Sequence, residues 1–280
     1  MRTALFMIAL LAGGCASVEP EPVGTAEAPI EQGEMLVYER GHAIDDDELV
    51  DLGPPEALGG TVLEGDPHIS ARVDHAEGTL LAGVFQATTG TVLIHFPFSE
   101  HATILSGSVA LTDESGNHAV LKPGDSYFIR QGSDILWKVK GDRVQKSFLN
   151  RVEAADSPGP MVIYDRGSEV DDSDLVDLGP PEGLGGTVIQ GDPHISARVD
   201  FANAGLLGGV FQATPGTVLI DFPFTEHATV TKGKVTLTDE DGETRTLRPG
   251  DAYLIRQGSQ ILWKVKGQPV QKSFLNFTSP

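Results

Sequence analysis

Two pairs of opposite charges lie in otherwise apolar segments of the chain. Glu100 and Lys146 are each flanked, two positions away on either side, by apolar residues. Because residues two apart share one face of a β-strand, both charges should point into the core of a β protein. A single buried charge is costly unless it is paired or binds a ligand. The sequence therefore predicts a buried acid–amine pair, which recurs as Glu226 and Lys272.

Four further side chains are candidates for the same two pockets. Trp137 and its counterpart Trp263 share a strand face with apolar residues and would form an aromatic wall. His95 and Asp221 occupy equivalent positions in a neighbouring strand. We expect each pocket to hold a carboxylate, an amine, an indole and either His95 or Asp221. The alternative is that each lysine extends to water at the pocket mouth and contributes only packing.

A pocket of this composition suits a small polar ligand such as a sugar, a uronate or an amino-acid derivative. A carboxylate accepts hydrogen bonds from hydroxyls, an ammonium pairs with a carboxylate, and an indole stacks on a sugar ring. General acid–base chemistry is a second option, because burial and a close opposite charge shift the pKa of each group in competing directions. The sequence contains no motif typical of a nucleophile triad, a phosphate loop or a redox site.

The pockets are expected twice because the chain contains two copies of one unit. Residues 36–150 align without a gap with 162–276, and most aligned positions are identical. We expect one domain over 35–150, a linker containing Pro and Gly over 151–160, and a second domain over 161–280. In each copy, short apolar alternations broken by turn residues predict about eight strands and no helix. This pattern is typical of a small antiparallel barrel or sandwich.

Each copy begins with an arm that precedes the barrel. Residues 45–56 are acidic and are predicted to form coil with a short turn, and 61–64 and 68–73 are predicted strands separated by Gly and Pro. An open sheet edge is a place where another strand can add. We therefore hypothesise that these arm strands cross onto the other copy and close its edge.

Four motifs follow one another in the same order in both copies. They are G-x-V-x-L-T-D-x-x-G, L-x-P-G-D-x-Y-x-I, W-x-V and V-x-K. Together they resemble the cupin superfamily, and most closely the branch that contains ureidoglycine aminohydrolase and the ethanolamine-utilisation cupins. The resemblance covers nearly all of both copies. It implies an all-β fold of two tandem cupin barrels, each a double-stranded β-helix or jelly roll, that together form a bicupin.

The resemblance also allows a test for the metal site of cupin enzymes, which typically use a His-x-His pair, a glutamate and a second-motif histidine. Carried over, these positions are Leu93, His95, Glu100 and Ile135 in the first copy and Leu219, Asp221, Glu226 and Ile261 in the second. A transition metal needs three or four converging ligands, so we expect no metal, no other cofactor and no catalytic residue. His101 and His227 face away from the adjacent glutamates along a strand, and we expect them at a surface or an interface.

The first 34 residues differ in composition from the rest. In residues 1–15, a basic residue, a short apolar run and small residues precede Cys15, the only cysteine. This pattern resembles a bacterial lipoprotein signal peptide with a lipobox, whose cysteine is lipidated; the alternative is an ordinary secretory signal cleaved nearby. Residues 16–34, rich in Pro, Ala and Glu, are predicted to be a disordered tether. We expect a lipid-anchored protein of the bacterial cell envelope that faces the periplasm or the cell exterior.

The negative charge of the chain argues against partners that are themselves negatively charged. A formal net charge of −20 at pH 7 argues against nucleic acid and anionic membrane surfaces, because phosphates would be repelled. Membrane contact is therefore expected only through the lipid anchor. The preferred interpretation is an accessory protein that binds a small molecule without metal catalysis. One alternative is an enzyme of aminohydrolase or isomerase type that uses His95 and Glu100 with a metal, or Glu100 alone as base. Another is a structural module whose edges pair into a homodimer or a larger oligomer.

Overall fold

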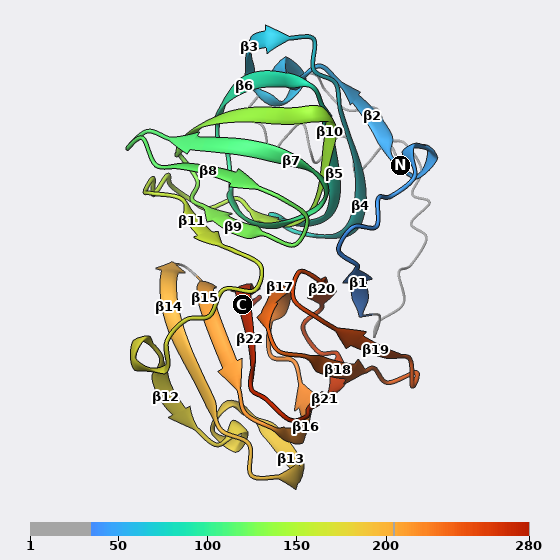
Figure 1. Ribbon diagram of the computed structural model, residues 1–280, viewed down its shortest axis with the longest axis vertical. Helices are drawn as coiled ribbons and strands as arrows, with labels where there is room; N and C mark the ends of the chain where they lie inside the picture. Colours follow the sequence, from blue (N-terminus) through green and yellow to red (C-terminus); the bar gives the residue numbers. More distant parts are fainter. Residues whose placement is uncertain (1–34, 204, 280) are drawn as a thin grey trace.

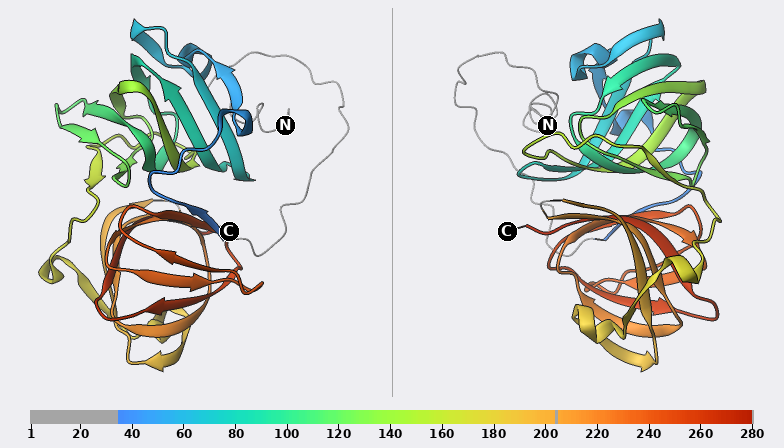
Figure 2. Two further views of the ribbon diagram at one scale, coloured as in Figure 1. Left: turned by 45° about the vertical axis from the view of Figure 1, so that its right-hand side comes forward. Right: turned by 90° about the vertical axis from the view of Figure 1, so that its left-hand side faces the viewer.

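The computed structural model describes residues 35–203 and 205–279. Within these residues the two copies form two β-barrels, the first above the second in Figure 1, and Figure 2 shows them from two further sides. The predicted all-β class of two tandem jelly-roll barrels is confirmed. In this part of the chain no helix is long and apolar enough to cross a bilayer. The short 3-10 helices, which the sequence did not predict, are η1 (Asp46–Glu48), η2 (Pro55–Leu58), η3 (Asp172–Asp174) and η4 (Pro181–Leu184).

Each copy contains more strands than the eight or so that the alternation of apolar residues predicted. The first copy contains β1 (Leu36–Tyr38), β2 (Val50–Gly53), β3 (Thr61–Gly65), β4 (Ile69–Glu77), β5 (Leu80–Thr88), β6 (Gly90–His95), β7 (Ser99–Asp113), β8 (His118–Leu121), β9 (Ser126–Ile129) and β10 (Asp134–Arg151). The second contains β11 (Val162–Tyr164), β12 (Val176–Gly179), β13 (Gly186–Gly191), β14 (Ile195–Asn203), β15 (Leu206–Ala213), β16 (Gly216–Asp221), β17 (Thr225–Lys232), β18 (Val235–Thr238), β19 (Thr244–Leu247), β20 (Ala252–Ile255), β21 (Gln260–Val265) and β22 (Val270–Phe277).

Two long strands, β7 and β10, connect the other strands of the first barrel. β7 pairs with β8, β9 and β10, and β10 also pairs with β5 and β6. β7 and β10 pair with each other over most of their length, with a register shift between Lys140 and Val144. Gly107 lies at this shift with a φ of 73°, and a Cβ there would lie 2.0 Å from the carbonyl oxygen of Arg143. The close approach therefore requires glycine. In the second barrel the equivalent segments are divided into β17 and β18 and into β21 and β22.

The first strand of each copy belongs to the sheet of the other barrel. β1 pairs antiparallel with β20, and β11 pairs antiparallel with β9 (Figure 1). Each added strand covers a sheet edge that would otherwise be open. The hypothesis of a strand exchange is therefore right, but the strands that we expected to cross are wrong. The segments 61–64 and 68–73 stay in their own barrel, where β3 pairs with β6 and β4 pairs with β5.

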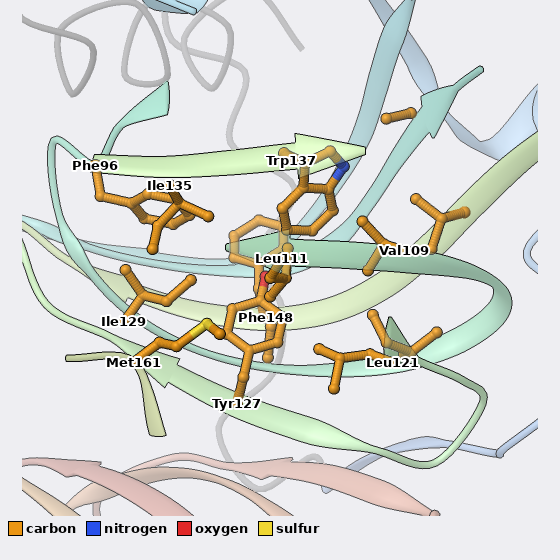
Figure 3. Close-up of a cluster of buried hydrophobic side chains, with 14 of the residues drawn as sticks. Phe96, Val109, Leu111, Leu121, Tyr127, Ile129, Ile135, Trp137, Phe148 and Met161 are labelled. Atoms are coloured by element: carbon orange, nitrogen blue, oxygen red, sulfur yellow. The ribbon is translucent and has the colours of Figure 1, made fainter. Parts of the chain in front are cut away.

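The exchange also places apolar side chains from one copy in the core of the other. Met161, which precedes β11, packs in the core of the first barrel, beside Tyr127 and Ile129 (Figure 3). Met35, which precedes β1, packs in the core of the second barrel. Each barrel thus buries apolar surface supplied by the other copy, which stabilises the arrangement of two barrels as one unit.

A buried polar cluster lies between the two barrels. His101 and His227 have no solvent exposure, and their Nδ1 atoms lie 2.8 Å apart. His101 Nε2 lies 3.0 Å from Ser273 Oγ, and His227 Nε2 lies 3.0 Å from Ser147 Oγ. Of the two locations that we expected for these histidines, a surface or an interface, the structure shows the interface. Adjacent strand positions point Glu100 into the barrel and His101 out of it, against the second barrel.

Burial sets the protonation state of this cluster. Desolvation lowers the pKa of His227 from its usual value of 6.5 to about 3. Desolvation, with the neighbouring His227, holds the pKa of His101 well below the same value. Both imidazoles are therefore neutral at pH 7, and one Nδ1 donates its proton to the other.

We expect acid to destabilise the folded chain through these two histidines. In the unfolded chain each binds a proton near pH 6.5, whereas His227 in the folded chain binds one only near pH 3. Their contribution is therefore complete above about pH 6.5 and falls as the pH drops below it. Between pH 7 and pH 5 the free energy of unfolding should fall by about 2 kcal/mol through His227, and His101 should add a loss of the same sign. Urea unfolding at the two pH values measures this loss, and a similar loss in the His101→Gln/His227→Gln variant would contradict it.

Candidate functional site

Each barrel contains a partly open cavity lined almost entirely by apolar side chains. Its volume is about 120 Å³ in the first barrel and about 270 Å³ in the second. In the first barrel, strands β2, β4, β5, β6, β7 and β10 contribute to the walls, and η2 contributes Pro55 and Leu58. Five aromatic rings lie among more numerous aliphatic side chains in this lining, and Figure 3 shows two of the rings, Trp137 and Phe148, close together in the interior. The polar side chains among the lining residues, apart from the indole of Trp137, are those of Thr88, Glu100, Lys146 and Asn150.

The predicted acid–amine pair lies at this cavity and includes a third residue. Lys146 Nζ donates a hydrogen bond to Glu100 Oε1 and another, at 2.8 Å, to Tyr127 Oη. Tyr127 Oη donates to the same Glu100 oxygen at 2.6 Å. Glu100 is 1% exposed and Lys146 is 5% exposed, so neither charge reaches bulk water. The second barrel repeats the arrangement with Glu226, Lys272 and Tyr253.

Aromatic rings surround the buried ammonium on its other sides. Lys146 Nζ lies 5.1 Å from the ring centroids of both Phe85 and Trp137, and 6.0 Å from that of Phe148. Ring faces at this range attract a cation. The second barrel places the equivalent rings at 5.0 Å, 5.0 Å and 6.0 Å from Lys272 Nζ. The lysine is therefore held by one carboxylate, one phenol and several ring faces.

Burial also changes the acidity of these groups. Desolvation lowers the pKa of the Lys146 ammonium, although the Glu100 charge opposes this shift. Desolvation and the Glu100 charge raise the pKa of Tyr127 well above its usual value of 10. The phenol therefore stays protonated at neutral pH and continues to donate to Glu100. Lys272 and Tyr253 are shifted in the same directions.

Two buried polar atoms of the lining have no hydrogen-bond partner among the described residues. They are the donor Nε1 of Trp137 and the acceptor Oδ1 of Asn150. Asn150 pairs with Glu100 across β10 and β7, so it lies beside the acid–amine pair. An unpaired buried polar atom lowers the stability of the folded state by about 1–3 kcal/mol. Such atoms are therefore uncommon in folded proteins and call for an explanation. Both recur in the second cavity, at Trp263 Nε1 and Asn276 Oδ1.

His95 and Asp221 do not join the cavities, and this part of the predicted site is wrong. Ile94 and Phe96 line the first cavity, so His95 between them points to the opposite side. Its side chain is 60% exposed, and its Nδ1 lies 2.8 Å from Asp134 Oδ1. Asp221 is likewise exposed and accepts a hydrogen bond from Gln260 at 2.8 Å.

The residues at the cupin metal positions do not fit a transition metal. His95 points away, Leu93 and Ile135 have no donor atoms, and Glu100 already contacts the Lys146 ammonium. Over residues 35–203 and 205–279, no three His, Cys, Asp or Glu side chains gather in a way that could hold a metal ion. The buried ammonium supplies the positive charge that balances Glu100.

The structure thus brings together three of the four predicted side chains in each copy. Glu100, Lys146 and Trp137 meet at the first cavity, and Glu226, Lys272 and Trp263 meet at the second. The alternative in which the lysines reach water does not hold, because both are 5% exposed. Sequence reasoning missed Tyr127 and Asn150. Two signals could have found them, since Asn150 lies two residues beyond Phe148 on the same strand face and Tyr127 lies inside the P-G-D-x-Y-x-I motif.

Known proteins provide a comparison for this arrangement. A family model described as an EutQ-like cupin domain matches residues 75–148 and 206–274. No curated protein is similar enough to this chain to count as a match. A protein of unknown function from Pseudomonas syringae pv. tomato str. DC3000, of the DUF861 family, has a similar solved structure, with a TM-score of 0.68 and 22% identity. The match covers 88% of this chain and 100% of that one.

A second solved structure, of a cupin 2 conserved barrel domain protein from Leptotrichia buccalis, is more distant. Its TM-score is 0.50 at 8% identity, and the match covers 78% of this chain and 92% of that one. At these identities the two structures support the fold alone.

Removing the buried ammonium should destabilise the first barrel. In Lys146→Met, Glu100 would remain buried without its counter-charge, and we expect the free energy of unfolding to fall by about 3–5 kcal/mol. Adding Glu100→Gln should recover part of this loss, because the unpaired charge is then absent. Lys138→Met, which removes an exposed lysine paired with Glu64, is the matched control and should change little. Urea unfolding measures all three, and a loss below about 1 kcal/mol for Lys146→Met would mean that the lysine is not effectively buried.

Proposed function

Because this chain belongs to the family of EutQ-like cupin domains, we propose that each barrel binds a small molecule in its interior cavity. The proposal depends mainly on one observation. The same donor and the same acceptor, an indole N–H and an amide oxygen, are buried in both cavities without a partner in the part of the chain that the structure describes. Both atoms are closed off from solvent as the side chains stand, so a ligand that offers one acceptor and one donor would remove the cost of leaving them unpaired once the indole and the amide turn toward the cavity. The family relation supports the barrel as the place of binding, since pockets commonly form in barrel interiors.

The cavity lining favours a more apolar ligand than the sequence indicated. A sugar carries many hydroxyls, and most of them would face the phenylalanine, leucine and valine side chains of the walls. Burying a hydroxyl without a hydrogen bond costs roughly 1–3 kcal/mol. We therefore propose a ligand with an apolar body and one hydroxyl, carbonyl or amide group, in place of a sugar or a uronate.

Electrostatics favours an uncharged ligand. Glu100 and Lys146 neutralise each other, so the cavity has no charge to offer a partner. A carboxylate would have to compete with Glu100 for the ammonium and would leave one carboxylate buried without a counter-charge. The alternative of an enzyme that uses His95 with Glu100 lacks support, because His95 lies outside the cavity.

The two cavities should accept ligands of different size. Leu58 packs against the core at the first cavity, whereas its counterpart Leu184 is 56% exposed. The preceding residue is Ala57 in η2 and Gly183 in η4. The second cavity is the larger of the two. We therefore propose that the second barrel accepts the bulkier ligands.

We also propose that the protein acts outside the cytoplasm, attached to the bacterial envelope by a lipid on Cys15. The support is the sequence pattern of residues 1–15, which lie outside the described residues, as does the predicted tether. Attachment to an envelope would place both cavities where small molecules from the surroundings reach them.

Tryptophan emission provides a direct test of binding, because the chain has two tryptophans and each lines one cavity. We expect cyclohexylmethanol to shift the emission of both Trp137→Phe and Trp263→Phe, each of which keeps one reporter. A second, bulkier alcohol should act more strongly on Trp263 than on Trp137. Glucose is the matched polar compound and should have little effect. If no small alcohol or ketone changes the emission of either variant, the proposed binding function is wrong.

Lipid attachment predicts incorporation of fatty acid. Cells that express the full chain with radiolabelled palmitate should yield a labelled protein in the membrane fraction, because the Cys15 thiol would carry the acyl anchor. The Cys15→Ser variant should lose the label and leave that fraction. Equal labelling of both proteins, or none in either, would overturn the proposed anchor.

A further inference from the structure

Lys146 has the surroundings of a reactive amine as well as those of an ion pair. Its Nζ donates to two oxygens, Glu100 Oε1 and Tyr127 Oη, and the remaining contacts near it are ring faces. It lines the cavity that we propose to bind a small molecule. Lys272 has the same surroundings in the second cavity.

The pair can become neutral without losing its hydrogen bond. In an apolar cavity two separate charges are poorly solvated, and moving one proton from Nζ to Glu100 Oε1 converts them into an amine and a carboxylic acid. The two atoms are already in hydrogen-bond contact. The titratable groups that contact Lys146 are Glu100 and Tyr127. Tyr127 stays protonated, so it can stabilise Glu100 in either form.

We propose that Lys146 and Lys272 each form a reversible Schiff base with a small aldehyde or ketone whose body is apolar. This inference rests on the proposed binding function and gives it a substrate class. An apolar body fits the walls of the cavity, and the carbonyl carbon is the electrophile that an uncharged amine attacks.

The reaction balances with the groups that are present. After Glu100 takes one proton from Nζ, the nitrogen lone pair attacks the carbonyl carbon, and the carbonyl electron pair moves to oxygen. Glu100 returns its proton to that oxygen and takes a second proton from nitrogen, which gives a carbinolamine. Glu100 then protonates the hydroxyl, which leaves as water while nitrogen and carbon form a double bond. The product is a protonated imine paired with the Glu100 carboxylate, and no oxidant or reductant is consumed.

Reductive trapping tests this inference on the full chain. The protein is incubated with cyclohexanecarbaldehyde and sodium cyanoborohydride, which reduces an imine to a stable secondary amine, and the modified lysines are located by peptide mass spectrometry. Lys122 and Lys234 are exposed and serve as internal controls. At pH 7 an exposed lysine is almost wholly protonated, so we expect Lys146 and Lys272 to react at least about tenfold faster. Their rates should also reach a plateau at lower pH than those of the two controls.

Two further measurements distinguish a failure of the Schiff-base inference from a failure of the proposed binding function. Lys146→Met should lose labelling in the first cavity only, and continued labelling of Lys272 shows that the second barrel remains folded. Cyclohexylmethanol, which lacks the carbonyl, should shift tryptophan emission without covalent change. If the alcohol shifts emission but both buried lysines react no faster than Lys122 and Lys234 at every pH, the Schiff-base inference is overturned while binding stands. If neither compound shifts emission and the buried lysines are not favoured, both proposals fall.

Discussion

One constraint organises each barrel: an ammonium and a carboxylate are buried together in an apolar interior, where neither could remain alone. The pair draws its contacts from three strands, since Glu100 lies on β7, Tyr127 on β9 and Lys146 on β10. Glu100 and Lys146 both line the cavity, and the rest of its lining consists mainly of aliphatic and aromatic side chains. The same residues therefore stabilise the barrel and supply the chemically active groups of its cavity.

The pairing of the two barrels depends on the same strands. β7 carries Glu100 toward the cavity and His101 toward the other barrel, where His101 meets His227. The exchanged strands β1 and β11 extend the sheets that contain these residues. In β7 and β17, one strand face lines the cavity and the opposite face contacts the other barrel. The contact of each histidine with the other barrel therefore helps to fix the position of the glutamate that precedes it.

Much of this could be predicted from the sequence, for reasons that also explain the errors. Strand alternation identified Glu100, Lys146 and Trp137, because each lies within a regular strand with a clear apolar face. His95 was expected in the pocket because it occupies a metal position of cupin enzymes, whereas alternation along its own strand places Ile94 and Phe96 at the cavity and His95 outside it. The burial of His101 and the exchange of β1 and β11 depend on how the barrels stack, which no local pattern records. The unpaired atoms of Trp137 and Asn150 depend on the contacts of individual atoms, which only coordinates supply.

The most direct measurement is a high-resolution crystal structure of the chain grown with cyclohexylmethanol. We expect the alcohol in the cavities, with its oxygen within hydrogen-bond distance of Trp137 Nε1 or Asn150 Oδ1 and the Lys146–Glu100 pair intact. A structure in which Lys146 turns out to solvent and protein side chains fill the space beside Trp137 would contradict a binding cavity built around a buried ion pair.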